Sequence, residues 1–239
     1  MKIVLSPQRR DDELIVVKSG DQLTINNTVY DFSQVSEGDS LPYSAIDSIW
    51  LPGDVVRVGG ELVLTLLLPN PANYSQAQAF PKPLMNVPDG LIAFPAPVLP
   101  DGEIYSPPQP DPDATASQGV IDWSQLITKA MKDAQVAAQD LSLAKSELQA
   151  RSTLAATQIA RIQDRIDTLG FGIEIGEATS EDEVELADLA APLKAWKTYK
   201  YALGKVTVQP TWYQAPVWPV EPPIPEIIAA PMMASAETM

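Results

Sequence analysis

The feature that most constrains this chain is its longest interval without proline or glycine, which runs from residue 120 to residue 169. Proline and glycine both destabilise the interior of a helix. A stretch of this length without either residue therefore indicates one long helix. Asp122 or Ser124 can cap its start, and Gly170 is expected to end it. At about 1.5 Å per residue such a helix measures roughly 70 Å. We therefore assign residues 120–170 to one long helix.

Apolar residues return every seven positions along this helix, which is the spacing of a coiled-coil seam. The main series starts at Val120 and continues with Ile127, Ala134, Leu141, Leu148, Ala155, Ile162 and Leu169. A second series consists of Met131, Ala138, Ile159 and Ile166, with Lys145 and Ser152 as interruptions. The residues of the main series from Ile127 onward are candidate oligomerisation residues. The alternative is that the same seam packs against another segment of its own chain.

Residues 1–70 are expected to form a small antiparallel β domain, because short β-prone runs there alternate with turn residues. The Gly59-Gly60 pair between VVRV and ELVLTLLL is the strongest hairpin signal, and Asn26-Asn27 gives a second one. About 70 residues make a marginal core, so this domain is expected to lean on a partner or on copies of itself. The first strands are predicted at residues 2–5, 14–18, 22–25 and 28–32.

Residues 71–119 are expected to be an extended connector, because twelve prolines fall between Pro69 and Pro112 and no periodicity is present. A loosely tethered linker is the simplest interpretation. However, the segment also holds many apolar residues, among them Phe80, Leu91 and Phe94. These favour a connector that is laid against a surface.

In the C-terminal module, residues 171–226, Thr179 precedes an acidic turn that suits a helix N-terminus. We expect Pro192 to open a second helix rather than kink the first, with Gly204 at its end. A β-prone run at residues 205–209 and an extended tail rich in tryptophan and proline follow. Residues 227–239 are expected to fray. The predicted fold class is therefore α+β with a modular organisation.

Composition excludes several classes of function. The chain has no cysteine and no histidine, which removes thiolate nucleophiles, Ser-His-Asp triads and imidazole acid–base catalysis. The acidic residues that remain are adjacent in sequence, and nucleotide-binding glycine motifs are absent. We expect no enzyme activity, no cofactor and no metal. The net charge of −15 argues against nucleic acid as a partner, and no apolar run is long enough for a membrane span.

Four features in order carry a family resemblance: a helix, an acidic turn (LGFGIEIGEATSEDEVEL), the run LKAWKTYKYALGKV, and a tail with Trp-Pro and Glu-Pro-Pro. This segment, residues 159–223, resembles the C-terminal module of bacteriophage tail-fibre assembly proteins. The matching residues are Ala195, Trp196, Lys197, Tyr199, Leu203, Val206, Trp218 and Pro219. The resemblance implies a phage or prophage origin and a role with the receptor-binding fibre at the tail tip.

On this resemblance, we expect the helical module to bind a tail fibre by burying aromatic residues. The candidate partner-binding residues are Leu193, Trp196, Lys197, Tyr199, Lys200, Leu203, Trp212 and Trp218. The heptad pattern also predicts either self-association, with a trimer favoured, or a complex with a trimeric fibre. The expected location is the host cytoplasm during assembly, and the virion tail if the contact persists.

Two other roles are open at this stage. The chain can be a permanent baseplate or fibre-anchor component of the virion, in which the β domain grips the particle and the helices form a stalk. It can also be a host-directed binding module such as an inhibitor, which predicts a monomer with an isolated acidic patch. The heptads argue against that last role.

Overall fold

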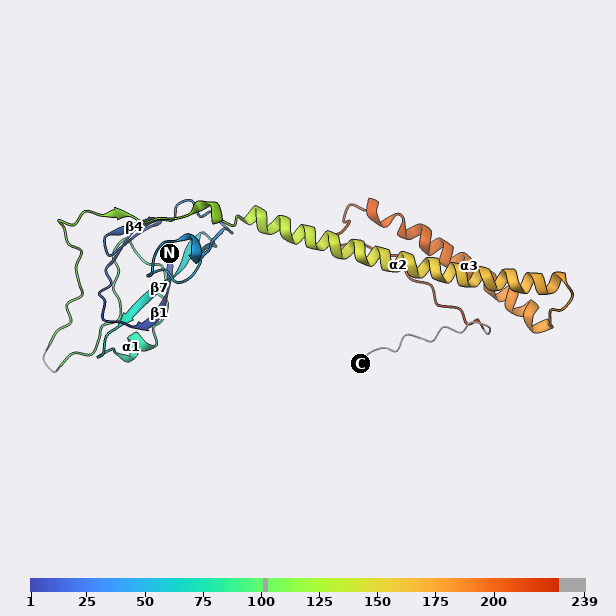
Figure 1. The fold of residues 1–239 in the computed structure, drawn as a ribbon, viewed down its shortest axis with the longest axis horizontal. Helices are drawn as coiled ribbons and strands as arrows, with labels where there is room; N and C mark the ends of the chain where they lie inside the picture. Colours follow the sequence, from blue (N-terminus) through green and yellow to red (C-terminus); the bar gives the residue numbers. More distant parts are fainter. Residues whose placement is uncertain (101–102, 228–239) are drawn as a thin grey trace. The chain divides into compact units, whose positions relative to one another are not determined.

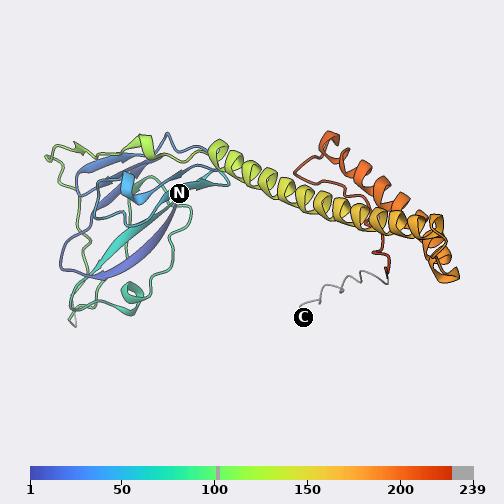
Figure 2. The ribbon, with the colours of Figure 1, turned by 45° about the vertical axis from the view of Figure 1, so that its right-hand side comes forward.

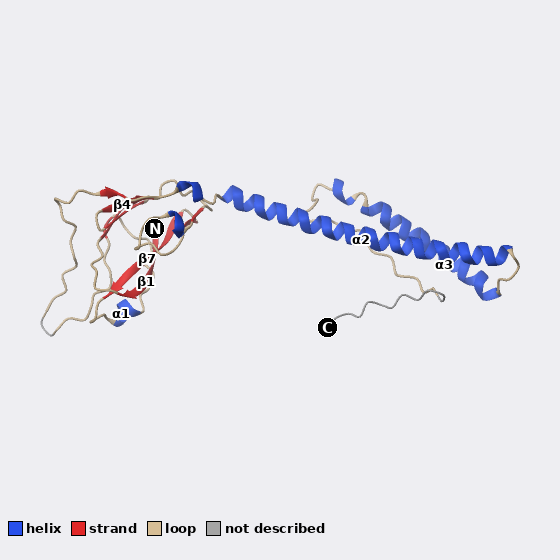
Figure 3. Cartoon of the chain, viewed as in Figure 1, coloured by secondary structure: helices blue, strands red, loops and turns tan. Residues whose placement is uncertain are grey.

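The structure, a computed structural model, describes residues 1–100 and 103–227 (Figures 1 and 3). It divides into a β unit, Met1–Ala134, and a helical unit, Gln135–Met239. Strands occupy the first unit, while the second holds most of one long helix and all of another. The expected α+β class is thereby confirmed at this level of description.

Two sheets form the β unit. The first has the strand order β1-β7-β6-β5 and the second the order β8-β2-β3-β4-β9. The first sheet consists of β1 (Lys2–Arg9), β7 (Glu61–Asn70), β6 (Val55–Val58) and β5 (Ser40–Leu41). The second consists of β8 (Gly90–Leu91), β2 (Val16–Ser19), β3 (Gln22–Ile25), β4 (Thr28–Asp31) and β9 (Ser117–Gln118). A single apolar core contains buried residues of both sheets, including Ile3, Leu23, Phe32 and Leu64.

Both hairpins that the sequence predicts are present. Asn26 and Asn27 have φ angles of 44° and 66° between β3 and β4, and Gly59 and Gly60 have 63° and 78° between β6 and β7. Two consecutive positive φ angles are the requirement of the tight turns that match strand twist. The turn residues therefore set the register of these two strand pairs.

The expectation of an antiparallel β domain is wrong for two pairs. Strand β1 runs parallel to β7, from Lys2 beside Val63 to Arg9 beside Asn70, and β4 runs parallel to β9. Parallel neighbours cannot be joined by a short turn, so no local signal in the sequence announces them. The sheets are consequently mixed.

The proline-rich connector is part of the β unit. Ile3 and Leu84 exchange two backbone hydrogen bonds of 2.9 and 2.8 Å, and the Ile92 amide donates to the Val16 carbonyl at 2.8 Å. Val87 and Ile92 are buried in the core. The segment also contains the short helix α1 (Gln76–Ala79), which Ser75 and Gln78 close with a capping box. The connector thus covers sheet edges that would otherwise be open.

The long helix α2 begins later and ends later than the sequence predicts, at Lys129–Glu174 instead of 120–170. Residues 120–128 join the β unit: Ile121 bridges to Ile46, and Ile127 exchanges hydrogen bonds with Ser40. The buried Asp39 then accepts the Lys129 backbone N–H at 2.7 Å, which caps the helix from a distant loop. Gly176, with φ of 73°, lies just beyond the C-terminus.

Helix α3 runs from Ser180 to Leu203 without interruption, so the expectation that Pro192 opens a new helix is wrong. Proline removes one hydrogen bond from a helix interior. Leu189 before it and Trp196 after it are both buried, and their packing holds the helix together across this position. The predicted β run at 205–209 is a short 3-10 helix, Val206–Val208.

Gly119 supplies a test of how the connector attaches. A Cβ there would lie 2.4 to 2.8 Å from ring carbons of the buried Tyr30, while the Gly119 N–H donates to Val29. We expect Gly119→Ala to lower the free energy of unfolding of the β unit by about 1–3 kcal/mol, because overpacking displaces this segment. Urea unfolding measures it. The neighbouring exposed Gln118→Ala is the control, and equal stability of both variants would contradict the close approach.

Candidate interaction surface

The core of the helical unit lies between α2 and α3, which cross at an angle (Figures 1 and 2). Trp196, Tyr199 and Leu203 of α3 are buried there, and the rings of Trp196 and Tyr199 meet edge to face with centroids 5.7 Å apart. From α2 the same core receives Ala155, Ile162 and Leu169. The seam of α2 is thus filled over its C-terminal half by the same chain.

The second line of this seam is more polar than the sequence analysis assumed. Ala144, Arg151, Gln158 and Arg165 recur every seven residues, one position before the interrupted series. Ala144 and Gln158 are buried, and Arg165 forms two hydrogen bonds of 3.2 and 2.6 Å with Glu185 of α3. These bonds to Glu185 raise the pKa of Arg165. Such paired charges favour one helix register over others.

A proline-rich segment, residues 219–227, follows the two helices as an extended strap. The Trp196 indole N–H donates to the Pro223 carbonyl at 3.2 Å, and Arg161 donates to the Pro225 carbonyl at 2.6 Å. Ile227 is fully buried in the helical core. The expected fraying therefore does not hold for Ile227, and residues 228–239 lie outside the described residues.

Residues 209–217 form a loop whose neck is closed by one side chain. The amide of Gln209 donates to the Val217 carbonyl and accepts from the Val217 N–H, both at 2.8 Å. Tyr213, with φ of 59°, turns the chain at the middle of this loop. We call this segment the clipped loop.

An aromatic stack anchors the clipped loop to α2. Trp212 and Trp218 meet edge to face at 6.5 Å, and the Arg151 guanidinium lies 5.1 Å from the Trp218 ring centroid. Arg151 also pairs with Glu147 at 2.6 Å and donates to the Tyr199 hydroxyl at 3.4 Å. Cation–π and ion-pair contacts together fix the guanidinium between the core and the loop.

The candidate partner-binding residues separate into three groups. Trp196, Tyr199 and Leu203 are buried within the chain, and Leu193, Trp212 and Trp218 are half-buried. Lys197 and Lys200 are exposed. The side chains available to a partner are therefore the lysines and the outer edges of the tryptophans. The aromatic stripe at helical spacing chiefly builds the core of the unit.

The candidate oligomerisation residues divide along the helix. Ala155, Ile162 and Leu169 are buried against α3, and Leu148 packs beside them. Leu141 is half-buried, while Ile127 and Ala134 are exposed. Ile127 precedes α2 and belongs to the β unit. Only the N-terminal part of the predicted seam is left uncovered by the described chain.

Exposed apolar residues that the sequence analysis did not single out lie around the clipped loop. Val208 and Val217 are 76% and 69% exposed, and Val220 is 91% exposed. The Gln209 clip holds Val217 beside the segment that carries Val208. Valines in a proline-rich tail give no periodic signal, so only the structure identifies them as surface residues. Together with Trp212 they offer apolar area for a protein partner.

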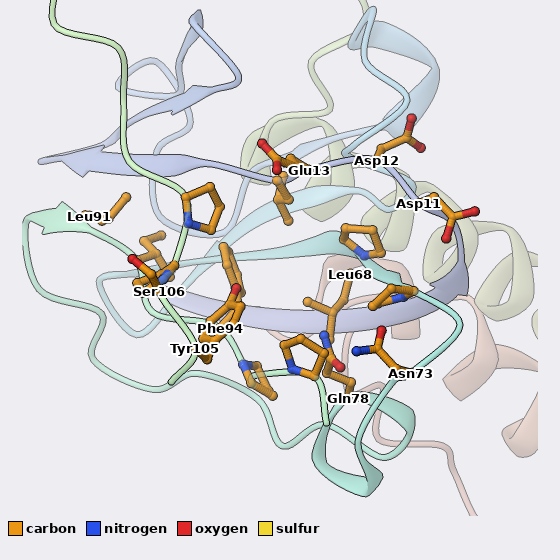
Figure 4. A pocket seen from close by; sticks show the side chains of 18 residues that line it. Asp11, Asp12, Glu13, Leu68, Asn73, Gln78, Leu91, Phe94, Tyr105 and Ser106 are labelled. Atoms are coloured by element: carbon orange, nitrogen blue, oxygen red, sulfur yellow. The ribbon is translucent and has the colours of Figure 1, made fainter. Parts of the chain in front are cut away.

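A groove in the β unit has a volume of about 360 Å³ and is lined by the connector and the loop before β2 (Figure 4). Phe94 and Tyr105 form its apolar side, whereas Asp11 and Asp12 lie at the rim and point away from them. Asp11 pairs with Arg9 at 2.6 Å, and Asp12 pairs with Arg10. Both rim aspartates are thus engaged by arginines close to them in the sequence.

Within residues 1–100 and 103–227, no cluster of three or more metal-ligating side chains is found. In the same part of the chain, no helix has the length and apolar character needed to cross a membrane. Comparison with protein-family models, with curated proteins and with solved structures finds no match.

Replacement of Trp196 tests the architecture of the helical unit. We expect Trp196→Ala to reduce the free energy of unfolding by about 3–5 kcal/mol, because it leaves a cavity between the helices and the strap. Trp196→Phe, which removes the bond to Pro223 but keeps most of the volume, should cost less. Urea unfolding followed by circular dichroism measures both. A Trp212→Ala variant as costly as Trp196→Ala would contradict this placement.

The start of α3 predicts a pH dependence. The Thr179 backbone N–H, its hydroxyl and nearby Arg165 lower the pKa of Asp182 in the folded state. Ionised Asp182 therefore stabilises the fold fully above its unfolded pKa of about 3.9, and this contribution is lost as the pH falls through the folded value.

We expect Asp182→Asn to lower the urea midpoint at neutral pH, with a deficit that shrinks below about pH 4 as the parent carboxylate becomes neutral too. Urea midpoints measured across this range check it. The exposed Asp188→Asn on the same helix is the control. A deficit that stays constant with pH would refute the role of the charge.

Proposed function

We propose that the chain is a bacteriophage tail protein that binds the tail fibre, the receptor-binding protein, and aids its assembly or attachment at the tail tip. The support is the resemblance of residues 159–223 to tail-fibre assembly proteins, together with the clipped loop. That loop is the observation that carries the proposal. It presents Val217 and the outer edge of Trp212 next to the exposed Val208, on a support fixed by Gln209 and Arg151.

A rigid loop suits protein recognition, because a surface that is ordered before binding loses little conformational entropy on contact. Partly exposed aromatic residues beside valines match the composition of interface centres. Lys200 and Lys205 lie near the same end of α3 and favour an acidic partner surface. The proposed site of action is the host cytoplasm during assembly.

Permanent residence in the virion, as a baseplate or fibre-anchor component, is the second candidate. The ordered strap and the connector that covers the sheet edges favour this second candidate. A chaperone that dissociates from the fibre does not require two extended segments fixed along its surface. In either version the partner is a fibre or baseplate protein. The uncovered N-terminal part of α2, with exposed Met131 and Val136, would add contact area in a trimeric assembly.

Co-expression with the tail fibre of the same phage tests the proposal. We expect Trp212→Ala with Val217→Asp to abolish co-purification with the fibre, because the loop then loses its apolar contact area. Circular dichroism should remain helical. The matched control carries Tyr43→Ala with Val58→Asp, an equal change at exposed positions of the β unit.

Quantitative peptide mass spectrometry of purified particles separates the two versions. A fixed copy number in the virion identifies a structural component, and abundance in the lysate without incorporation identifies a chaperone. Undiminished fibre capture by the loop variant would contradict the assigned surface.

A further inference from the structure

The charges of α3 are segregated along its length. Its first half carries Glu181, Asp182, Glu183, Glu185 and Asp188 and no basic residue, while its second half carries Lys194, Lys197 and Lys200 and no acidic residue. The helix dipole favours this arrangement only within the first and last turns. Asp188, Lys194 and Lys197 lie farther inside, so the dipole does not account for them.

Several of these charges border an exposed face of α3. Glu181, Glu183, Asp188 and the three lysines are exposed, whereas Asp182 and Glu185 are turned toward Arg165 of α2. Val184 and Tyr201 on this face are 61% and 71% exposed, and the buried residues of α3 lie on the opposite side. Between them, Ala187, Ala190, Ala191 and Thr198 are also exposed. Alanine at the middle of a helix face permits close approach of another helix axis. In the described part of the unit this face is left exposed, and the strap runs along one border of it, where Pro219 and Pro223 line a hollow together with Ala191 and Thr198.

From these observations we infer that the outer face of α3 binds a second copy of this chain, with the two α3 helices antiparallel about a two-fold axis near Ala191. In this register the basic half of each helix lies beside the acidic half of the other. Lys197 comes within one helical turn of Glu183 of the second copy, and Lys194 lies within about 8 Å of it along the helix axis. The contact is isologous, so each charge pair occurs twice.

A parallel arrangement is unfavourable, since it places acid beside acid and lysine beside lysine along the whole contact. The size of the face limits the affinity. A 24-residue helix is about 36 Å long, and a face roughly 10 Å wide gives about 700 Å² for both copies together, below the ~1,200 Å² of stable interfaces. The dimer is therefore weak and salt-dependent. It is independent of the fibre assignment and can hold if that assignment fails.

Cysteine cross-linking of the full chain tests the register. The chain has no native cysteine, so any disulfide must join the introduced residues. Ala191→Cys lies at the axis and should form a disulfide-linked dimer under mild oxidation. Thr198→Cys, on the same face, should not, because its two copies are roughly 20 Å apart while a disulfide needs Cα atoms within about 7 Å. Cross-linking of both variants means parallel packing, and cross-linking of neither means no contact; either result overturns the inference.

Charge reversal tests the interaction in solution by sedimentation velocity at low salt. Lys194→Glu with Lys197→Glu leaves Lys200 as the one basic residue of α3, and Glu181→Lys with Glu183→Lys removes most of the acidic charge of the helix. Each variant alone should sediment as a monomer, whereas their mixture should recover a dimer. Lys82→Glu with Lys145→Glu, which changes net charge equally elsewhere, should leave the parent dimer intact. A monomeric parent, or a mixture that stays monomeric, would refute the pairing.

Discussion

The indole of Trp196 is the point where the three segments of the helical unit meet. Its ring lies between α2 and α3 against the edge of Tyr199, and its N–H reaches the strap at Pro223. A buried indole N–H without an acceptor costs about 1–3 kcal/mol. The strap supplies the acceptor that the two helices do not provide. Arg151 then continues the chain of contacts from Tyr199 to Trp218. The clipped loop depends on this sequence of contacts for its position.

The polar members of the α2 seam have a different role from its apolar members. Ala155, Ile162 and Leu169 would accept many apolar partners, because burial of aliphatic surface is not directional. Arg165 and Arg161 are compatible with few packing partners, because each guanidinium needs a hydrogen-bond acceptor at a defined place. The acceptor is the Glu185 carboxylate for Arg165 and the Pro225 carbonyl for Arg161. The seam therefore combines general affinity with a requirement for one register of α3 and the strap.

Local signals predicted much of this fold. The Asn-Asn and Gly-Gly turns, the helix start at Thr179 and the presence of one long helix all follow from residues near one another in the sequence. Long-range choices did not follow. The parallel pairing of β1 with β7 has no turn to announce it. Residues 120–128 contain no proline or glycine, yet Ile121 and Ile127 pair with Ile46 and Ser40. For the candidate site, the periodicity of Trp196, Tyr199 and Leu203 predicted burial but could not say which chain covers them.

The parallel strand pair has a consequence for the chain as it is synthesised. Strand β1 leaves the ribosome before its partner β7, which follows some fifty residues later, and before Leu84, which follows later still. At roughly 5–20 residues per second, the apolar residues of β1 wait for several seconds without a partner. The edge that closes last, residues 117–127, immediately precedes α2. Strand β1 is therefore paired with β7 and Leu84, and the β unit is complete, before the long helix α2 is synthesised.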